Sequence, residues 1–316
     1  MNFKVDPKLI EKACDLLRRG EVVAMPTETV YGLAANATDD RGIVKIYEMK
    51  NRPSFNPLII HVTDLADAKK YASFSKVAEL LADSFWNLDR HRSLTLVLPR
   101  LENSGLSHLA TAGLDTVAIR VPGHPVALEL LSQFKFPLAA PSANRSNHIS
   151  PTTAQHVCES FEGKSLFILD GGPSSVGLES TILDVTGDQP VLLRPGGTAV
   201  EEIEEVLNIP VLRHAAPSAI IKAPGMLKRH YAPKLPLRLN VLEPLEGEAF
   251  LGFGTNKKAT LNLSSSANLS EAASNLFSML RSLDNPKFTG IAVMPVPEQG
   301  LGLAINDRLS RAASKE

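Results

Sequence analysis

Side chains that can bind anions gather in two segments near the N-terminus of this 316-residue chain. Residues 26–33 read PTETVYGL and place hydroxyls and a carboxylate directly after an apolar run. Residues 50–61 read KNRPSFNPLIIH and bring two cations, an amide and an imidazole together after one expected helix. Such cations form charge-assisted hydrogen bonds to phosphates and carboxylates that are roughly twice as strong as neutral ones. The two segments therefore predict a site for a nucleotide and a small acid.

Structural explanations compete with this interpretation. Lys50 and Arg52 also suit the negative end of a helix dipole, and His61 taken alone is compatible with an ordinary core histidine. Arg120 lies in the apolar run TVAIRV, where a buried guanidinium needs a facing anion. That anion can be a bound carboxylate or phosphate, or a glutamate in a structural ion pair. Both alternatives stay open from the sequence.

Two further loops carry ligand-type residues. Residues 141–146, PSANRS, can cradle phosphate with backbone N–H groups or form an ordinary turn. The glycines of 170–185, DGGPSSVGLESTILDV, match neither the P-loop pattern nor GxGxxG, so Glu179, Ser180 and Arg194 are better ligand candidates. No metal-ligand spacing and no Ser/His/Asp or Cys/His arrangement stands out. We expect no metal ion held by protein ligands.

The composition predicts a soluble globular protein. The chain is 44% hydrophobic with a formal net charge of −1, which argues against a surface wholly devoted to nucleic acid. Cys14 and Cys158 are far apart and outside any CxxC spacing, so neither a disulfide framework nor a cysteine zinc site is expected. The N-terminus lacks an apolar signal region, and no stretch approaches about 18 apolar residues. A cytoplasmic location without a membrane span is therefore expected.

Apolar runs alternate with helical patterns in the first part of the chain, which predicts an α/β fold with a large twisted mixed sheet and flanking helices. Asp6 and Gly20 would delimit a first helix. Strand patterns fall at 22–25, 58–62, 94–98, 116–121, 138–140, 166–170, 181–185 and 191–193, and further helical patterns at 40–49, 76–85, 124–134, 152–161 and 199–207. A short GDQP turn joins the last two strands, which must pair antiparallel.

The pattern changes after residue 207. Residues 208–236 are rich in proline and basic at Lys228, Arg229, His230 and Lys234, which is typical of a linker. Strand and helix patterns resume at 249–253, 260–263, 270–283, 291–295 and 303–313. We therefore expect a large α/β domain at 1–207, a linker at 208–236 and a small C-terminal α/β Rossmann-like domain at 237–316.

Six motifs together resemble the YrdC-type threonylcarbamoyl-AMP synthase family in its longer, two-domain form. They are PTETVYGL at 26–33, KNRPSFNPLIIH at 50–61, Ser142-Ala143-Asn144, ESTILD at 179–184, LRPG at 193–196 and APGMLKRHYAP at 223–233. Their common order spans nearly the whole chain, which makes the resemblance specific. It implies that residues 1–207 form a YrdC-like catalytic domain and that the linker folds over its cleft as a lid.

The resemblance also implies a reaction. A nucleotidyltransferase of this family joins L-threonine, bicarbonate or CO2, and ATP into threonylcarbamoyl-AMP and pyrophosphate, with Mg2+ accompanying ATP. The product feeds modification of the adenosine next to the anticodon in tRNAs that read ANN codons. Implied partners are thus a tRNA and downstream threonylcarbamoyl-transferase proteins.

By the same resemblance, each site residue has an expected role. Lys50 and Arg52 would lie beside the reacting groups as catalytic residues. Threonine would be held by Thr29, His61, Arg120, Ser180 and the main chain at Ala140. ATP would be held by Arg52, Asn56, Thr116, Ser142, Asn144, Ser150, Arg194 and Tyr231. Transfer of this kind depends mostly on positioning and charge neutralisation, so it needs no protein nucleophile.

Two other functions compete with this one. The basic linker would also suit a non-catalytic module that grips structured RNA. The related domain of hydrogenase-maturation carbamoyltransferases is an enzyme alternative, but those proteins carry paired-cysteine zinc fingers. Two isolated cysteines cannot supply such fingers.

Overall fold

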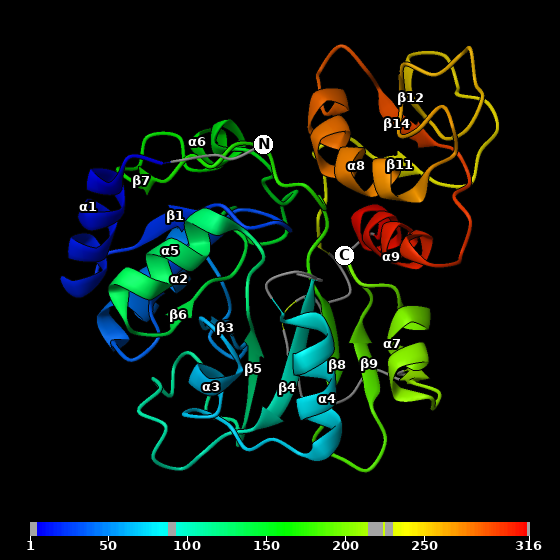
Figure 1. Ribbon diagram of the computed structural model, residues 1–316. Coiled ribbons are helices and arrows are strands. Elements are labelled where there is room, and N and C mark those ends of the chain that lie inside the picture. The colour runs from blue at the N-terminus through cyan, green and yellow to red at the C-terminus, as the bar shows by residue number, and fades with distance from the viewer. Residues whose placement is uncertain (1–4, 88–92, 214–223, 225–229, 315–316) are drawn as a thin grey trace.

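The computed structural model describes residues 5–87, 93–213, 224 and 230–314. Their strands form two sheets, each accompanied by helices (Figure 1). Much of the expected linker, including the basic residues Lys228 and Arg229, lies outside the described residues. The expected domain boundaries at 207 and 236 stay predictions.

The large sheet has the strand order β10-β9-β8-β4-β5-β3-β6-β2-β1-β7. Its strands are β1 (Val23–Met25), β2 (Gly32–Asn36), β3 (Ile59–His61), β4 (Leu94–Pro99), β5 (Thr116–Arg120), β6 (Leu138–Ala139), β7 (Phe167–Ile168), β8 (Thr181–Asp184), β9 (Val191–Arg194) and β10 (Leu212–Arg213). β3 and β5 are parallel, whereas β4 and β5 are antiparallel. The expected antiparallel pair of β8 and β9 is also present. The predicted mixed sheet is confirmed.

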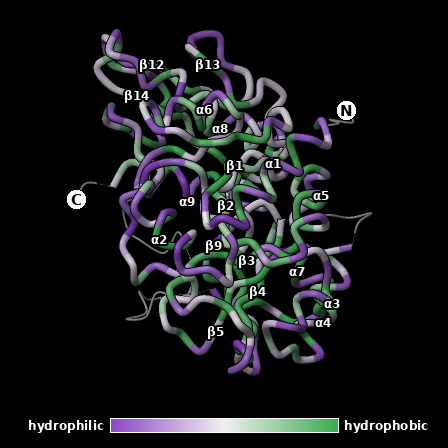
Figure 2. Tube along the Cα trace, turned by 90° about the vertical axis from the view of Figure 1, so that its left-hand side faces the viewer, coloured by the Kyte–Doolittle hydropathy of each residue, from purple (hydrophilic) through white to green (hydrophobic). Residues whose placement is uncertain are grey.

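Helices cover this sheet and close its core. They are α1 (Pro7–Arg18), α2 (Asp40–Lys50), α3 (Leu65–Ala68), α4 (Lys76–Phe85), α5 (Pro125–Phe134), α6 (Ala154–Ser160) and α7 (Val200–Leu207). α1 begins as expected, because the Asp6 side chain accepts the N–H of Lys8 and Pro7 takes the first helical position. In Figure 2 the hydrophobic segments run through the central strands, whereas hydrophilic segments lie mainly on outer loops.

Strand β2 was not predicted from the sequence. Its residues, GLAAN, are small and lack the β-branched and aromatic side chains that signal a strand. Pairing with β1 and β6 nevertheless fixes it inside the sheet. The small side chains serve close packing, because a Cβ on Gly42 of α2 would lie 3.0 Å from that of Ala35.

The small sheet has the order β11-β14-β12-β13, and all its described pairs are parallel. Its elements are β11 (Leu237–Arg238), β12 (Glu248–Gly252), β13 (Leu261–Asn262) and β14 (Gly290–Val293), with α8 (Leu269–Leu283) and α9 (Leu301–Ala313). Together they form what we call the C-terminal unit. Its hydrophobic core also includes Val30, Ile149 and Leu178 from the first part of the chain. The two sheets are therefore joined by shared packing.

Among the described residues, no helix has the length and apolar character needed to cross a membrane.

Candidate active site

The strand directions bring several expected site residues to one edge of the large sheet. The last residues of β3 and β5, His61 and Arg120, are direct partners. β8 runs parallel to β4 and hence antiparallel to β5, so Ser180, which precedes β8, lies at the same edge. Arg194 ends β9 and pairs with Ile182 of β8. Residues distant in the chain thus meet.

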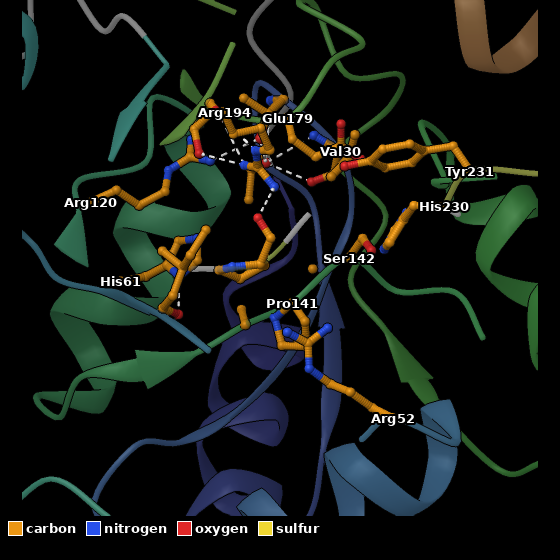
Figure 3. Close-up of a pocket in the computed structure, with 17 residues that line it drawn as sticks. Val30, Arg52, His61, Arg120, Pro141, Ser142, Glu179, Arg194, His230 and Tyr231 are labelled. Atoms are coloured by element: carbon orange, nitrogen blue, oxygen red, sulfur yellow. Dashed lines mark hydrogen bonds between the residues drawn. The ribbon is translucent and has the colours of Figure 1, made fainter. Parts of the chain in front are cut away.

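A pocket lies at this edge, and the linker residues His230 and Tyr231 form one side of it (Figure 3). The predicted residues that line it are Thr29, Arg52, His61, Arg120, Ala140, Ser142, Ser180, Arg194 and Tyr231. The lining is completed by Thr27, Val30, Gly32, Ile59, Pro141, Glu179, Pro224 and His230. The remaining cavity measures about 50 Å³, whereas pockets for drug-sized ligands measure about 300–1,000 Å³. The free space in the pocket is therefore too small for a nucleotide in this conformation.

Arg120 is held by the turn between β1 and β2. Its Nη2 pairs with Glu28, and its Nη1 donates to Thr29 Oγ1 at 3.0 Å. Glu28 also accepts the Gly123 N–H at 2.7 Å. The structural ion pair considered from the sequence is thus present, yet Arg120 Nε is buried without a partner among the described residues. This donor can still bind a ligand carboxylate, so the two roles are compatible.

His61 lines the pocket as a neutral imidazole. Its Nδ1 lies 3.2 Å from the Ile59 carbonyl oxygen, which can only accept, so Nδ1 carries the proton. Burial, followed by the charge of Arg120, lowers the pKa of His61 to about 3. The other ring nitrogen, Nε2, is then an acceptor suited to a hydroxyl or amine of a ligand.

Arg52 and Arg194 supply positive charge from two directions, as Figure 3 shows. Arg52 donates from Nε to the Asn56 carbonyl at 3.2 Å and from Nη2 to the Pro57 carbonyl at 2.9 Å. Burial lowers the pKa of Arg52 to about 10, so it stays protonated at neutral pH. Arg194 donates from Nη2 to the Ser180 carbonyl at 2.8 Å. Carbonyl partners fix both guanidinium groups without neutralising them.

Lys50 lies behind the pocket rather than in its lining. Its ammonium donates to the carbonyls of Ser142 at 2.6 Å and Asn144 at 2.5 Å, and its own carbonyl accepts the Ser146 N–H at 2.8 Å. Burial, followed by the charge of Arg52, lowers the pKa of Lys50. In this structure Lys50 therefore holds the 142–146 loop. Its place beside the reacting groups stays a prediction.

Four predicted residues, Asn56, Thr116, Asn144 and Ser150, do not line the pocket. Asn56 and Asn144 each keep a buried Oδ1 without a partner among the described residues, which fits an amino group of a ligand. Ser150 Oγ donates to Glu179 Oε1 at 2.5 Å. Thr116 begins β5, whereas Arg120 ends it, so the structure places Thr116 at the far end of the strand from this pocket. Its role at ATP stays a prediction.

Arg308 of α9 is a candidate that sequence reasoning missed. Its Nε donates to Glu179 Oε2 at 2.8 Å. Burial opposes the charged form of Glu179, but the charges of Arg308 and Arg194 and the Ser150 hydroxyl outweigh it and lower the carboxyl pKa. An arginine in an amphipathic helix normally faces water, so no local signal in the sequence marked Arg308 as buried.

His230 was grouped only with the basic linker, but it lines the pocket. Its Nδ1 is buried without a partner among the described residues. Burial is the main cause that lowers its pKa to about 3, so His230 is neutral and does not add to the positive charge.

Family models cover the chain almost completely. A Sua5, YciO and YrdC model described as "Telomere recombination" matches residues 15–196, and a model described as "Threonylcarbamoyl-AMP synthase, C-terminal domain" matches residues 198–314. The threonylcarbamoyl-AMP synthase of Pyrococcus abyssi is 40% identical over 331 residues, which cover 98% of this chain and 95% of the relative. That of Bacillus subtilis is 41% identical over 329 residues, covering 98% and 93%.

The fold gives the same relationship. The crystal structure of Pyrococcus abyssi Sua5 complexed with L-threonine matches with a TM-score of 0.89 at 40% identity, covering 98% of this chain and 95% of that one. The predicted α/β architecture, with its large mixed sheet and small parallel C-terminal sheet, is therefore that of known relatives. This chain belongs to the YrdC-type threonylcarbamoyl-AMP synthase family, in the longer form that carries the C-terminal domain.

Proposed function

We propose that this protein synthesises threonylcarbamoyl-AMP from ATP, L-threonine and bicarbonate or CO2, with release of pyrophosphate. Relatives of nearly full length carry the name of this activity. One observation carries the proposal. In a single pocket, Arg120 and His61 form a site suited to a carboxylate, and Arg52 and Arg194 are held mainly by main-chain carbonyls rather than by ion pairs.

The Arg120 side of the pocket suits threonine. A carboxylate would bind the Arg120 Nε donor, and a hydroxyl or amine would donate to His61 Nε2. Thr29, Ser180 and the main chain at Ala140 would supply further hydrogen bonds, because all three line the same cavity. The threonine-bound relative supports a site of this class.

The other side of the pocket suits ATP. Arg52 and Arg194 would contact its phosphates, since guanidinium groups bind phosphate oxygens with charge-assisted hydrogen bonds. Asn56 and Asn144 offer unsatisfied acceptors among the described residues. Ser142, Ser150, Thr116 and Tyr231 are the remaining residues that we propose for ATP.

The reaction needs alignment more than a protein nucleophile. The neutral amine of threonine forms a bond to the carbon of CO2 and loses a proton, which gives a carbamate. A carbamate oxygen then attacks the α-phosphate in line, and the bond to the pyrophosphate leaving group breaks. Arg52 and Arg194 would offset the charge on the phosphates during this transfer. A held geometry of the reactants would supply much of the remaining rate enhancement.

We propose that Mg2+ arrives with ATP. The described residues contain no group of three or more His, Cys, Asp or Glu side chains that could hold a metal ion. Glu179 lines the pocket, but its two oxygens accept from Ser150 and Arg308. ATP phosphates and water would therefore be the ligands, and the ion would offset phosphate charge.

The product would pass to threonylcarbamoyl-transferase proteins that modify tRNAs reading ANN codons. Such an adenylate is a mixed anhydride, so it must be consumed by a transfer reaction or be lost to water. The non-catalytic RNA-binding alternative is not favoured. That alternative was based on the basic linker, whereas the relatives that match nearly the whole chain are named for synthesis of the adenylate.

The test of this proposal is pyrophosphate release by the purified protein in a coupled assay. We expect release only in the complete mixture of ATP, Mg2+, L-threonine and bicarbonate, and a loss of signal when threonine is omitted. Equal release without threonine would reject the proposal. Serine in place of threonine would measure selectivity, since one methyl group in a pocket is worth about 1–3 kcal/mol.

A further inference from the structure

Arg308 reaches from α9 of the C-terminal unit to the wall of the catalytic pocket. It is 0% exposed. Its Nε donates to Glu179 Oε2 at 2.8 Å, its Nη2 to the Pro195 carbonyl at 3.0 Å and its Nη1 to Asp307 Oδ2 at 2.5 Å. A buried guanidinium is unfavourable unless its donors are satisfied, and here every nitrogen is engaged. The surroundings are therefore shaped for an arginine.

One consequence of these contacts is a fixed Glu179. This carboxylate lines the pocket, and its second oxygen accepts from Ser150, a proposed ATP contact. The Glu179 carbonyl also accepts the Gly197 N–H at 2.9 Å. Arg308 thus orients a chain of groups that leads from the C-terminal unit to the ATP side of the pocket.

A second consequence is a fixed Tyr231. The Arg308 guanidinium carbon lies 5.0 Å from the centre of the Tyr231 ring, a cation–π distance. Phe277 of α8 stacks against the same ring with centroids 5.6 Å apart. Tyr231 has φ of 62°, a left-handed conformation that a non-glycine residue keeps only where its neighbours impose it. Those neighbours belong largely to the C-terminal unit.

We propose that Arg308 is a positioning residue for the reaction. From the C-terminal unit, its side chain holds Glu179 and Tyr231 in place and so assembles the ATP side of the pocket. This inference rests on the proposed function and gives the second sheet a part in it. Arg120 and His61, on the threonine side, do not depend on Arg308 in the same way, because their described hydrogen bonds go to the β1–β2 turn and to β3.

The experiment measures kcat/KM for ATP and the Kd for threonine in the Arg308→Met and Arg308→Lys variants. We expect Arg308→Met to lower kcat/KM for ATP about 10²-fold, the effect of a misplacement of about 1 Å in a reacting pair. The Kd for threonine alone, measured by calorimetry, should change less than about twofold. Arg308→Lys keeps the positive charge but lacks the planar guanidinium group, so its kcat/KM for ATP should recover only part of the way to the wild-type value.

Arg281→Met is the matched control. Arg281 also reaches from α8 to the first part of the chain, where its Nη2 donates to the Ile149 carbonyl and to Ser160 Oγ at 3.0 Å. It has no described contact with Glu179 or Tyr231. We expect it to weaken the interface without the selective effect on ATP. If Arg281→Met reproduced the Arg308→Met pattern, the inference would be wrong.

The double variant Arg308→Met with Glu179→Gln guards against simple misfolding. The double variant removes both the Arg308 guanidinium and the Glu179 carboxylate, so neither charge is left buried without its partner. Its fold should therefore be more stable than that of Arg308→Met. The ATP defect should persist, and its full recovery would overturn the inference. If the wild-type protein made no threonylcarbamoyl-AMP, the proposed function would fail separately. An unchanged ATP Kd in Arg308→Met, where the wild type binds ATP, would then count against the positioning role.

Discussion

Buried arginines at the pocket differ in the partners that hold them. Arg120 is neutralised by Glu28, whereas Arg52 and Arg194 are held mainly by main-chain carbonyls. A ligand carboxylate can bind one free donor of a guanidinium that is already ion-paired. A triphosphate carries several negative charges and is bound best by guanidinium groups that are not ion-paired. The distribution of charge among single residues therefore fits threonine on one side and ATP on the other.

Arg52→Ala tests this distribution. We expect a loss of about 10²–10³ in turnover, as for removal of one donor that stabilises developing charge. Threonine binding should be retained, because Arg120 and His61 keep their described partners. Arg41→Ala is the control, since Arg41 is an exposed cation of α2 that pairs with Asp39. Near-normal turnover of Arg52→Ala in the pyrophosphate assay would contradict the assignment.

The buried histidines predict how stability depends on pH. His61 and His230 have pKa values lowered to about 3, whereas an unfolded histidine has a pKa near 6.5. Between these values the unfolded chain binds more protons, so stability falls as the pH is lowered below about 6.5. As the pH falls through this range, each histidine should lower the free energy of unfolding by about 1.4 kcal/mol per pH unit.

Urea unfolding at pH 7 and pH 5 measures this loss. His61→Gln should reduce the difference between the two pH values by about 2 kcal/mol, the share of one histidine over 1.5 units. Equal stability of the wild-type protein at both pH values would show that these imidazoles are not buried as neutral groups.

Sequence patterns identified most pocket residues but not all their roles. Arg120 and His61 were expected in the strands at 116–121 and 58–62, and both lie in strands, at the last residue of each. Lys50 was expected beside the reacting groups, yet its ammonium holds the Ser142 and Asn144 carbonyls. Arg308 was missed because its partner, Glu179, is distant in the chain. Pairings of this kind depend on tertiary packing, which no local pattern records.

Elements with a strong hydrophobic period were predicted well, as in α4 and α5. β2 was missed because small residues carry no such period. In α1, the apolar residues Leu9 and Ile10 are adjacent, yet Ile10 is buried and Leu9 is 42% exposed. Two adjacent positions on a helix differ by about 100°, so they cannot both face the centre of the core.

Gly177 shows how closely the two units approach at the level of elements. A Cβ at this position would lie 2.5 Å from Ser274 Cα of α8, and its φ is 75°. Gly163 has a similar φ of 77° but has nothing within 4 Å of an added Cβ. Gly163→Ala should therefore cost about 1–2 kcal/mol from the backbone alone.

Gly177→Ala should cost about 1–3 kcal/mol more than Gly163→Ala, because the new methyl group pushes against α8. It should also lower activity with ATP, since α8 carries Phe277, which stacks on Tyr231. Thermal unfolding and steady-state kinetics of both variants provide the measurement. Equal effects of the two substitutions would mean that α8 does not pack tightly against this loop.

At the scale of the whole molecule, one hydrophobic cluster contains residues of both the C-terminal unit and the first part of the chain. We therefore expect equilibrium unfolding in a single transition, although two-domain chains often unfold in steps. Trp86 is the one tryptophan of the chain. It is buried against the large sheet, where its indole donates to the carbonyl of Leu94 in β4 at 3.0 Å. Trp86 fluorescence reports unfolding around the large sheet, whereas far-UV circular dichroism also reports the loss of α8 and α9. We predict that the two unfolding curves have the same midpoint. A further transition seen only by circular dichroism would show that the two parts of the chain unfold independently.

The most direct test of the proposed activity is mass spectrometry of the product formed from ATP, Mg2+, L-threonine and carbon-13 bicarbonate. We predict a threonylcarbamoyl-AMP mass that requires all three substrates and shifts with the carbon label. Arg52→Ala should remove most of this signal while the protein stays folded. A well-folded wild-type protein that binds ATP and threonine but forms no labelled adenylate would contradict the account.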